Sequence, residues 1–365
     1  MKKIIILGST GSIGTQVLDV VRAFPQELKV IGLSAHGNTE LFKKQIEEFQ
    51  PKYALQTSTV NDPVTELEKL AQTEEADLIV NSVCGSIGMW PTLAALEKGK
   101  NVALANKESM VMAGELVSKL QKEKGGRIVP IDSEPWALWT LLEGKTEHRQ
   151  AIEKVIITAS GGPFWKWERE QLEKVTREQA RSHPNWKMGE KISIDCATLM
   201  NKAFEIIETR WMFDIDPERI DVTVHRQSIV HGFVQWNDGS LQATLSHPDM
   251  RIPIQCALFF PRAIKNSLPR VNLDSLQLTF ERPDYSVFKG PLLAYESLKQ
   301  GGIMPAALCL LNEVAVGKFI RGDIGFLEIY PFIEEGLSRV KNEPVNIISL
   351  KKIITTISKG TEHYY

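Results

Sequence analysis

Short apolar runs alternate with amphipathic stretches along the first 131 residues. The runs are rich in Ile, Val and Leu, as buried strands are, and cover residues 3–7, 30–33, 77–81, 101–105 and 127–131. The stretches between them place apolar residues at helical spacing, over residues 15–24, 39–49 and 91–98. Because a helix in each crossover lets successive strands run in the same direction, this region predicts a parallel sheet covered on both faces.

The pattern changes after residue 131. Four short strands are predicted next, at residues 155–158, 222–225, 232–236 and 240–245. A helix is predicted over 199–211, and the turn Asn237-Asp238-Gly239 between the last two strands is a hairpin signal. These features predict an α+β region with an antiparallel sheet.

The last hundred residues divide into a proline-containing stretch and a helical one. Residues 260–286 have little periodicity and predict a linker, whereas helical spacing continues from about 287 to the end. The predicted fold is therefore α/β, in four parts. These are an N-terminal Rossmann-like parallel sheet at 1–131, a central α+β domain with the candidate catalytic residues at 132–260, a linker at 261–286, and a C-terminal helical domain at 287–365.

The charge balance argues against a general binder of nucleic acid or membrane surfaces. Lys plus Arg number 43 against 45 Asp plus Glu, a net charge of -2, whereas such binders need a basic excess. The apolar run at 4–7 is shorter than the roughly 7–15 residues of an export signal, and the longest run, 303–311, is too short for a bilayer. The four cysteines have no zinc-ligand or redox spacing. We expect a cytoplasmic protein without disulfides.

A glycine-rich turn, Gly8 to Gly14, follows the first predicted strand and opens the first helix. Glycines let the backbone approach a phosphate, and the free N–H groups of a helix start bind that anion. The G-x-x-G-x-x-G spacing is weak by itself, but its strand–turn–helix setting favours a dinucleotide site over a purely structural turn.

In dinucleotide-binding folds, side chains at the end of the second strand determine whether NAD or NADP binds. Residues 34–38 hold no acidic side chain for a ribose diol, which disfavours NAD. They also hold no Arg or Lys for a 2′-phosphate, so NADP is favoured mainly by default. His36 and Asn38 could donate to that phosphate, although each is also an ordinary turn residue.

Two carboxylates, Asp132 and Glu134, follow the last strand of this region. In an extended chain they point to the same side, and Pro135 favours an extended Glu134 while being tolerated in the first turn of a helix. Converging carboxylates suggest a hard divalent cation such as magnesium or manganese. A solvated acidic loop is the alternative.

A third metal ligand is available from the predicted helix 199–211. Asn201 and Glu205 share a face there at i and i+4, and Lys202 lies on a neighbouring edge. An ordinary surface helix is the competing interpretation.

Three further segments fit an anionic substrate. Ser160 precedes two glycines after a strand and supplies a hydroxyl and exposed N–H groups. The loop at 183–189 begins with His183 and contains Trp186, a composition suited to closing over a site. Asn106 and Lys107 follow a strand, at the carboxyl edge where parallel sheets bind ligands.

With these residues assembled, the chain closely resembles the 1-deoxy-D-xylulose 5-phosphate reductoisomerases over essentially its whole length. The matching strings, in order and at sensible spacing, are GSTGSIG at 8–14, ANKES at 105–109, DSE at 132–134, SGGPF at 160–164, HPNWKMG at 183–189, MNKAFE at 200–205, HPDMRIPI at 247–254 and NEVAV at 312–316. The resemblance implies a homodimeric enzyme that uses NADPH and Mn²⁺ or Mg²⁺, with Co²⁺ also possible. Its sugar phosphate substrate would be isomerised and reduced to 2-C-methyl-D-erythritol 4-phosphate.

The resemblance also implies roles for individual residues. The metal ligands would be Asp132, Glu134 and Glu205. Catalytic roles are implied for these three together with Lys107 and His183. The substrate would contact Ser133, Glu134, Ser160, His183, Cys196, Asn201, Lys202 and Glu205. The cofactor would contact Gly8, Thr10, Gly11, Ser12, Ile13, His36, Gly37, Asn38, Asn106, Glu108 and Gly189.

Four positions depart from the family pattern. Gly37 stands where a lysine often follows the second strand, and Ser182 stands where an arginine commonly precedes the loop histidine. Cys196 replaces a serine of the phosphate site, and a thiol is a weaker donor than a hydroxyl, so we expect weaker phosphate binding. Trp136 is a bulky residue beside the expected metal site and could reshape the pocket.

Two other functions are compatible with the sequence. The first is a divergent NADP-dependent reductase of another sugar phosphate, which would leave the carbon skeleton unbranched. The second is a nucleotide-binding sensor without catalysis, although intact candidate metal ligands argue against it.

Overall fold

A computed structural model describes residues 1–143, 150–182, 188–274 and 276–358. The chain forms two compact units, and each contains segments that are distant in sequence. The first comprises Met1–Met110, Gly114–Trp136 and Asp249–Pro269, and the second comprises Val111–Ala113, Ala137–Pro248 and Arg270–Tyr365. The four-part domain division given above stays a prediction.

The first unit is built on a six-stranded parallel sheet in the order β3-β2-β1-β4-β5-β6. Its strands are β1 (Lys2–Leu7), β2 (Leu28–Ala35), β3 (Tyr53–Gln56), β4 (Leu78–Asn81), β5 (Asn101–Leu104) and β6 (Ile128–Pro130). The central strand is completely buried over Ile4–Leu7. An all-parallel sheet of this kind is stable only when both faces are covered, so the predicted parallel sheet is confirmed.

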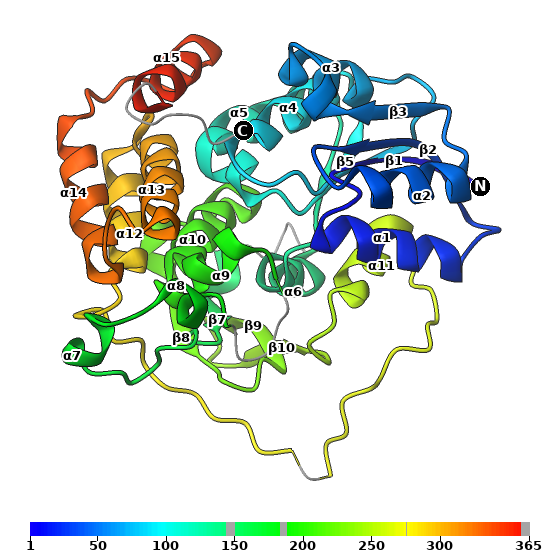
Figure 1. Cartoon of the computed structure of the whole chain (residues 1–365). Coiled ribbons are helices and arrows are strands. Elements are labelled where there is room, and N and C mark those ends of the chain that lie inside the picture. The colour runs from blue at the N-terminus through cyan, green and yellow to red at the C-terminus, as the bar shows by residue number, and fades with distance from the viewer. Residues whose placement is uncertain (144–149, 183–187, 275, 359–365) are drawn as a thin grey trace. The chain divides into compact units, whose positions relative to one another are not determined.

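Helices cover both faces of this sheet, and α1 and α11 lie on the face opposite α3 and α4 (Figure 1). The helices are α1 (Ser12–Ala23), α2 (Thr39–Phe49), α3 (Pro63–Ala71), α4 (Met89–Glu97), α5 (Lys107–Lys124), α6 (Ser133–Leu142) and α11 (Arg251–Phe259), with short 3₁₀ turns η1 (Thr57–Thr59) and η2 (Ser86–Gly88). The pattern analysis gave no element for β3, α3, α5 or α11. Helix α6 begins in the first unit and ends in the second.

Helix α11 returns to the first unit from far along the chain. It packs on α1, where the Phe24 and Phe259 rings meet edge to face with centroids 5.0 Å apart. The Lys2 ammonium donates to the carbonyl of Leu258 at 2.7 Å and so satisfies a free carbonyl of the last turn of α11. These contacts hold α11 in the first unit, although the sequence pattern assigns its residues to the central α+β domain.

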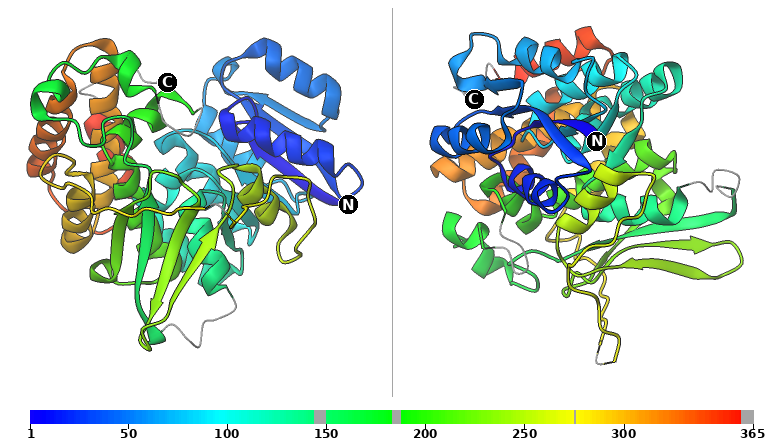
Figure 2. Two further views of the ribbon diagram at one scale, coloured as in Figure 1. Left: turned by 90° about the horizontal axis from the view of Figure 1, so that it is seen from below. Right: turned by 90° about the vertical axis from the view of Figure 1, so that its right-hand side faces the viewer.

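The second unit contains a four-stranded sheet in the order β10-β9-β7-β8, whose strands lie side by side in Figure 2. The strands are β7 (Ile152–Ala159), β8 (Ile220–Val224), β9 (Val230–Trp236) and β10 (Leu241–Leu245). Strands β9 and β10 form the predicted hairpin, but β7 and β8 are parallel, so the prediction of an antiparallel sheet is wrong for this pair. About 60 residues connect β7 to β8, which is long enough for the crossover that a parallel pair requires.

Helices form the remainder of the second unit. They are α7 (Arg169–Leu172), α8 (Arg177–Ala180), α9 (Glu190–Ala197), α10 (Met200–Phe213), α12 (Gly290–Gln300), α13 (Met304–Arg321), α14 (Ile329–Arg339) and α15 (Ile347–Ser358), with 3₁₀ turns η4 (Pro217–Arg219) and η5 (Phe326–Glu328). Helix α10 packs on α12, and the almost fully buried α13 packs on α14 and α15 (Figure 1). The predicted helical C-terminal region is confirmed.

The expected linker contains no helix or strand among its described residues, but it is anchored to the sheet. Val224 and Glu281 exchange backbone hydrogen bonds of 2.8 and 2.9 Å. The buried His225 ring stacks on Phe280 with centroids 4.7 Å apart. The segment is therefore part of the second unit over these residues.

The stability of this anchor is expected to depend on pH through His225. Its Nδ1 lies 2.9 Å from the Thr279 carbonyl and its Nε2 lies 3.2 Å from the Ile229 N–H, so Nδ1 donates, Nε2 accepts and the ring is neutral. Burial lowers the pKa of His225, so the unfolded chain takes up this proton more readily than the folded protein. The stability that the neutral His225 contributes is therefore complete above about pH 6.5, the pKa of a histidine in the unfolded chain, and is lost as the pH falls below that value.

Urea unfolding between about pH 5 and pH 8 would measure this dependence. We expect the free energy of unfolding to fall more steeply with acid for the wild type than for His225→Gln, whose side chain does not titrate. His247→Gln is the matched control, because His247 is exposed. Equal pH slopes for the wild type and His225→Gln would contradict the prediction.

Candidate active site

The predicted site residues of the first unit all follow strands of the parallel sheet. Parallel strands end at the same edge, so the segments after β1, β2, β5 and β6 gather there. These segments are the glycine-rich turn 8–14, residues 36–38, residues 106–108 and residues 132–134.

The glycine-rich turn has no room for side chains at two of its glycines. A Cβ on Gly8, which has φ +83°, would lie 2.6 Å from the Ser82 carbonyl oxygen, and one on Gly14 would lie 2.2 Å from the Gly8 oxygen. Gly11 is the N-cap of α1 and has no side chain to satisfy the first N–H groups of the helix. Those groups are available to an anion, with Thr10, Ser12 and Ile13 beside them.

The segment after β2 is exposed and spacious. The His36 Nδ1 lies 3.0 Å from the Thr57 Oγ1, which orients the ring, and Asn38 adopts a left-handed conformation as the N-cap of α2. Gly37 has no atom within 4 Å of the position that a Cβ would take. A larger side chain would therefore fit at residue 37.

Asn106 organises the start of α5. Its Oδ1 accepts the Ser109 N–H at 3.0 Å as a helix cap, and its Nδ2 donates to the Val83 and Gly85 carbonyls, each at 2.8 Å. The same amide lies 2.9 Å from a Glu108 carboxylate oxygen. Asn106 thus joins the loop after β4 to α5, a structural role beyond its predicted cofactor contact.

Lys107 and Asp132 form an ion pair in this part of the first unit. The Lys107 Nζ lies 2.6 Å from the Asp132 Oδ2, and the two side chains are 7% and 17% exposed. The Ser133 N–H donates to Asp132 at 3.0 Å, and the Ser133 hydroxyl donates to Glu134 at 2.6 Å. An ammonium, a hydroxyl and two carboxylates therefore lie together at the end of β6.

The backbone here differs from the sequence expectation. Helix α6 begins at Ser133, so Glu134 is helical rather than extended. The helix tolerates Pro135 because the N–H groups of its first turn need no partner within the helix. Trp136 is buried and contacts the Cys256 thiol of α11. It therefore contributes to the packing of the first unit.

In the second unit, α10 presents a buried carboxylate between two donors. Glu205 has no exposed surface, and its oxygens accept from the Asn201 amide at 2.5 Å and from the Lys202 ammonium. The predicted i, i+4 relation of Asn201 and Glu205 is thus present as a direct hydrogen bond. Lys202 is only 4% exposed, and Glu205 provides a negative charge beside its ammonium.

The turn after β7 brings Ser160 near the segment of Cys196. Gly161 and Gly162 have φ of +76° and +67°, and the Ser160 Oγ accepts the Gly162 N–H at 3.2 Å. A Cβ on Gly162 would lie 2.7 Å from the carbonyl oxygen of Cys196, so the turn lies directly on the end of α9. Gly189 is the exposed N-cap of the same helix, and His183 lies outside the described residues.

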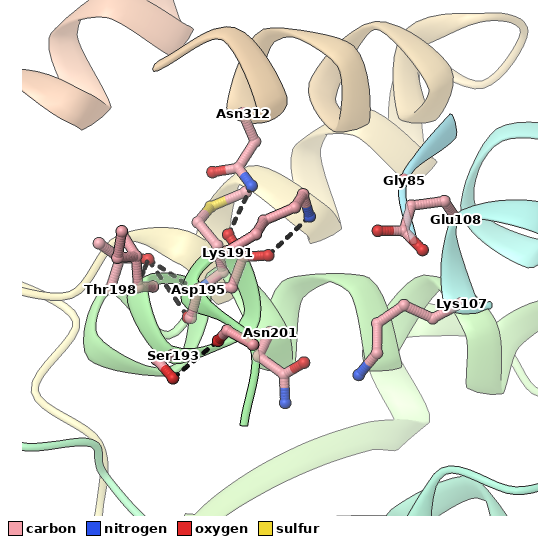
Figure 3. Close-up of polar contacts among 12 residues, drawn as sticks. Gly85, Lys107, Glu108, Lys191, Ser193, Asp195, Thr198, Asn201 and Asn312 are labelled. Atoms are coloured by element: carbon pink, nitrogen blue, oxygen red, sulfur yellow. Dashed lines mark hydrogen bonds and ion pairs between the residues drawn. The ribbon is translucent and has the colours of Figure 1, made fainter. Parts of the chain in front are cut away.

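A buried network that the sequence analysis missed holds α9 in place (Figure 3). The Asp195 carboxylate, 1% exposed, accepts from the Lys191 ammonium and from the Asn312 amide of α13, both at 2.7 Å. The i, i+4 spacing of Lys191 and Asp195 could have indicated their pairing, but nothing in the spacing indicates Asn312. The network fixes the helix that carries Cys196.

The fold and these segments define a class of protein. A parallel sheet in the order 3-2-1-4-5-6 with a glycine-rich turn after its first strand is typical of dinucleotide-binding α/β oxidoreductases. Acidic, amide and ammonium groups on the other segments are typical of an enzyme for a polar, anionic substrate.

Comparison with known proteins narrows this class. Residues 4–114 match the family 1-deoxy-D-xylulose 5-phosphate reductoisomerase, residues 128–213 match its C-terminal domain, and residues 245–361 match the DXP reductoisomerase C-terminal domain. The chain is 46% identical over 357 residues to the reductoisomerase of Desulforamulus reducens, covering 93% of this chain and 92% of that protein. It is 44% identical over 375 residues to that of Clostridium perfringens, with 96% and 97% covered.

Solved structures give the same result. A DOX-P reductoisomerase in complex with NADPH, fosmidomycin and magnesium has a TM-score of 0.91 and 32% identity, covering 98% of this chain and 96% of that one. The Zymomonas mobilis enzyme in complex with NADPH has a TM-score of 0.86 and 34% identity, with 98% and 97% covered. The chain belongs to the 1-deoxy-D-xylulose 5-phosphate reductoisomerase family.

The buried network of α9 predicts a stability effect at Asn312. Asn312→Ala removes one donor from the buried Asp195 carboxylate, and we expect the free energy of unfolding to fall by about 1–3 kcal/mol. Urea unfolding followed by circular dichroism measures this change. Asn272→Ala, at an exposed position of the second unit, is the control and should have little effect. A loss at Asn312 no larger than at Asn272 would contradict the prediction.

Proposed function

We propose that this chain isomerises 1-deoxy-D-xylulose 5-phosphate and reduces the product to 2-C-methyl-D-erythritol 4-phosphate, using NADPH and a divalent cation. The observation that carries this proposal is the set of paired acid and ammonium groups, the partly buried Lys107–Asp132 and the buried Lys202–Glu205, in a chain of this family. One related solved enzyme is in complex with NADPH and magnesium, and another is in complex with NADPH, which supports the cofactor assignment.

The first unit would bind NADPH along the carboxyl edge of its sheet. The N–H groups at the start of α1 suit the pyrophosphate, and the side chains at residues 36–38 include no acid that would repel a 2′-phosphate. Asn106 and Glu108, both buried, would shape the part of the site after β5, and Gly189 would contribute from the second unit.

The donor set fits a hard divalent cation. We propose Asp132, Glu134 and Glu205 as its ligands, since carboxylate oxygens are what magnesium and manganese prefer; cobalt is accepted as well. A bound cation would act as a Lewis acid towards substrate oxygens. The Lys107 ammonium holds the Asp132 carboxylate in a fixed orientation at 2.6 Å, and Ser133 does the same for Glu134.

The second unit would hold the sugar phosphate. Asn201 and Lys202 carry donors on α10, and the Ser160 turn and Cys196 lie next to each other at the end of α9. We propose that the phosphate binds to this group of donors and that His183 contributes to it. Hydride transfer then requires exclusion of water, which a loop over the substrate would provide.

We further propose that the enzyme is a cytoplasmic homodimer. All four cysteines are free thiols, as is usual in a reducing compartment. Among the described residues, no helix combines the length and apolar character needed to cross a bilayer. The dimer is proposed from the family resemblance alone.

A direct spectrophotometric assay tests the proposed activity. Purified protein is mixed with 1-deoxy-D-xylulose 5-phosphate, NADPH and manganese or magnesium, and NADPH oxidation is followed by its near-ultraviolet absorbance. We expect turnover that a chelator abolishes, that added metal restores, and that NADH supports poorly. A branched polyol phosphate as product confirms isomerisation, whereas an unbranched product would identify a simple reductase.

Cys196→Ser tests the proposed phosphate site. A hydroxyl is a better donor than a thiol, so we expect the KM for the sugar phosphate to fall roughly two- to tenfold, the value of one hydrogen bond, with kcat unchanged. Cys84→Ser makes the same chemical change at an exposed thiol of the first unit and should leave this KM unchanged. An unchanged or higher KM for Cys196→Ser would exclude the predicted role.

A further inference from the structure

Arg226 connects the end of β8 to the turn after β7. Its Nη1 donates to the carbonyl oxygen of Ser160 at 2.7 Å and to that of Gly162 at 2.6 Å. Strands β7 and β8 are parallel neighbours, with Ala159 opposite Val224, so residues just beyond their carboxyl ends lie close together. One guanidinium nitrogen therefore binds both ends of a three-residue turn.

This turn needs an external anchor to keep one conformation. Two consecutive glycines in the left-handed region have more conformational freedom than any other pair of residues. Within the turn, the Gly162 N–H is held by Ser160 Oγ at 3.2 Å. Two hydrogen bonds from a charged donor are stronger than this single neutral one, so Arg226 constrains the backbone of the turn more strongly than the Ser160 hydroxyl does.

The same contact affects the electrostatics of the turn. The guanidinium keeps its charge at any physiological pH. Bound to the carbonyl oxygens, it places positive charge at the backbone of the turn, which lies against the backbone of Cys196. Positive charge beside the turn favours a dianionic ligand more than a neutral one.

We propose that Arg226 is a positioning residue that orders the Ser160–Gly162 turn and thereby sets the affinity for the phosphate group of the substrate. The proposal rests on the proposed function, and it assigns to Arg226 no contact with the reacting atoms. The side chain acts through the turn, so its loss weakens substrate binding and leaves the chemical step intact.

The chain offers a matched control at the other end of the same strand. Arg219 donates from its Nε to the Glu153 carbonyl at 3.0 Å and from its Nη2 to the Ile152 carbonyl. It therefore makes the same kind of double contact with the backbone at the start of β7, far along the strand from Ser160. Arg219→Met removes an equivalent structural contact without changing the turn.

The test compares steady-state kinetics of the wild type, Arg226→Met, Arg226→Lys and Arg219→Met. For Arg226→Met we expect the KM for 1-deoxy-D-xylulose 5-phosphate to rise about tenfold or more, since two charge-assisted hydrogen bonds are lost, with kcat and the KM for NADPH within about twofold. The inhibition constant of inorganic phosphate should rise in parallel. Arg226→Lys should be intermediate, because the shorter side chain keeps the charge but cannot place a donor where Nη1 lies.

Either of two results would overturn the proposal: an unchanged KM in Arg226→Met, or an equal increase in Arg219→Met, which would indicate a general effect on the sheet. If Arg226→Met does not fold, as judged by circular dichroism, Arg226→Lys decides by the same criteria. Wild-type protein without turnover would count against the proposed function instead. In that case thermal stabilisation by inorganic phosphate tests the role of Arg226. Stabilisation that is lost in Arg226→Met or Arg226→Lys and kept in Arg219→Met supports this role. Stabilisation that persists in both Arg226 variants excludes it.

Discussion

The burial of a parallel sheet on both faces is the constraint from which the proposed cofactor site follows. Strand β1 is fully buried over Ile4–Leu7, so each of its neighbours must be reached through a helix on one face or the other. Every strand then ends at the same edge, and the loops that leave it are brought together without any specific attraction between them. The free N–H groups of α1 and the Asn106 cap of α5 are at this edge for that reason.

Buried ion pairs impose a second constraint. Asp132, Asp195 and Glu205 each have a lysine partner, and none of the three carboxylates is more than 17% exposed. A buried carboxylate without its partner would cost about 3–5 kcal/mol, so each pair fixes both of its side chains. The Asp195 pair differs from the others, since Asn312 completes it from another helix and its role is to hold α9.

The sequence predicts those parts of the fold that depend on local pattern. Apolar runs and helical spacing identify β1 and α2 almost to the residue, because burial of one face or of the whole strand dictates the pattern. Strand β3 was missed because it has only four residues and none is fully buried. The parallel pairing of β7 with β8 and the return of α11 to the first unit are set by tertiary contacts, which leave no periodic trace in the sequence.

The candidate site likewise contains residues that a local pattern predicts and residues that only tertiary contacts reveal. Residue types at fixed spacing predicted that Asn201 and Glu205 share a helix face, because i and i+4 positions are neighbours on any helix, and the two side chains are hydrogen-bonded there. Arg226 and Asn312 act on segments 64 and more than 100 residues away, and no local motif marks them. Such residues can be found only once the chain is folded, although they decide how firmly the predicted groups are held.

The departures from the family pattern at Gly37 and Cys196 lie at positions proposed to bind the cofactor or the substrate phosphate. They do not lie at the residues that form ion pairs in the interior. Gly37 is exposed and has open space around it, and Cys196 is half-buried at the end of α9. Lys107 and Glu205, by contrast, are buried in ion pairs that leave little freedom for substitution. Changes at the first kind of position alter the hydrogen bonds available to a phosphate, each worth about 0.5–1.5 kcal/mol. They therefore tune the affinities for the cofactor and the substrate, and the groups proposed for the chemical step are retained.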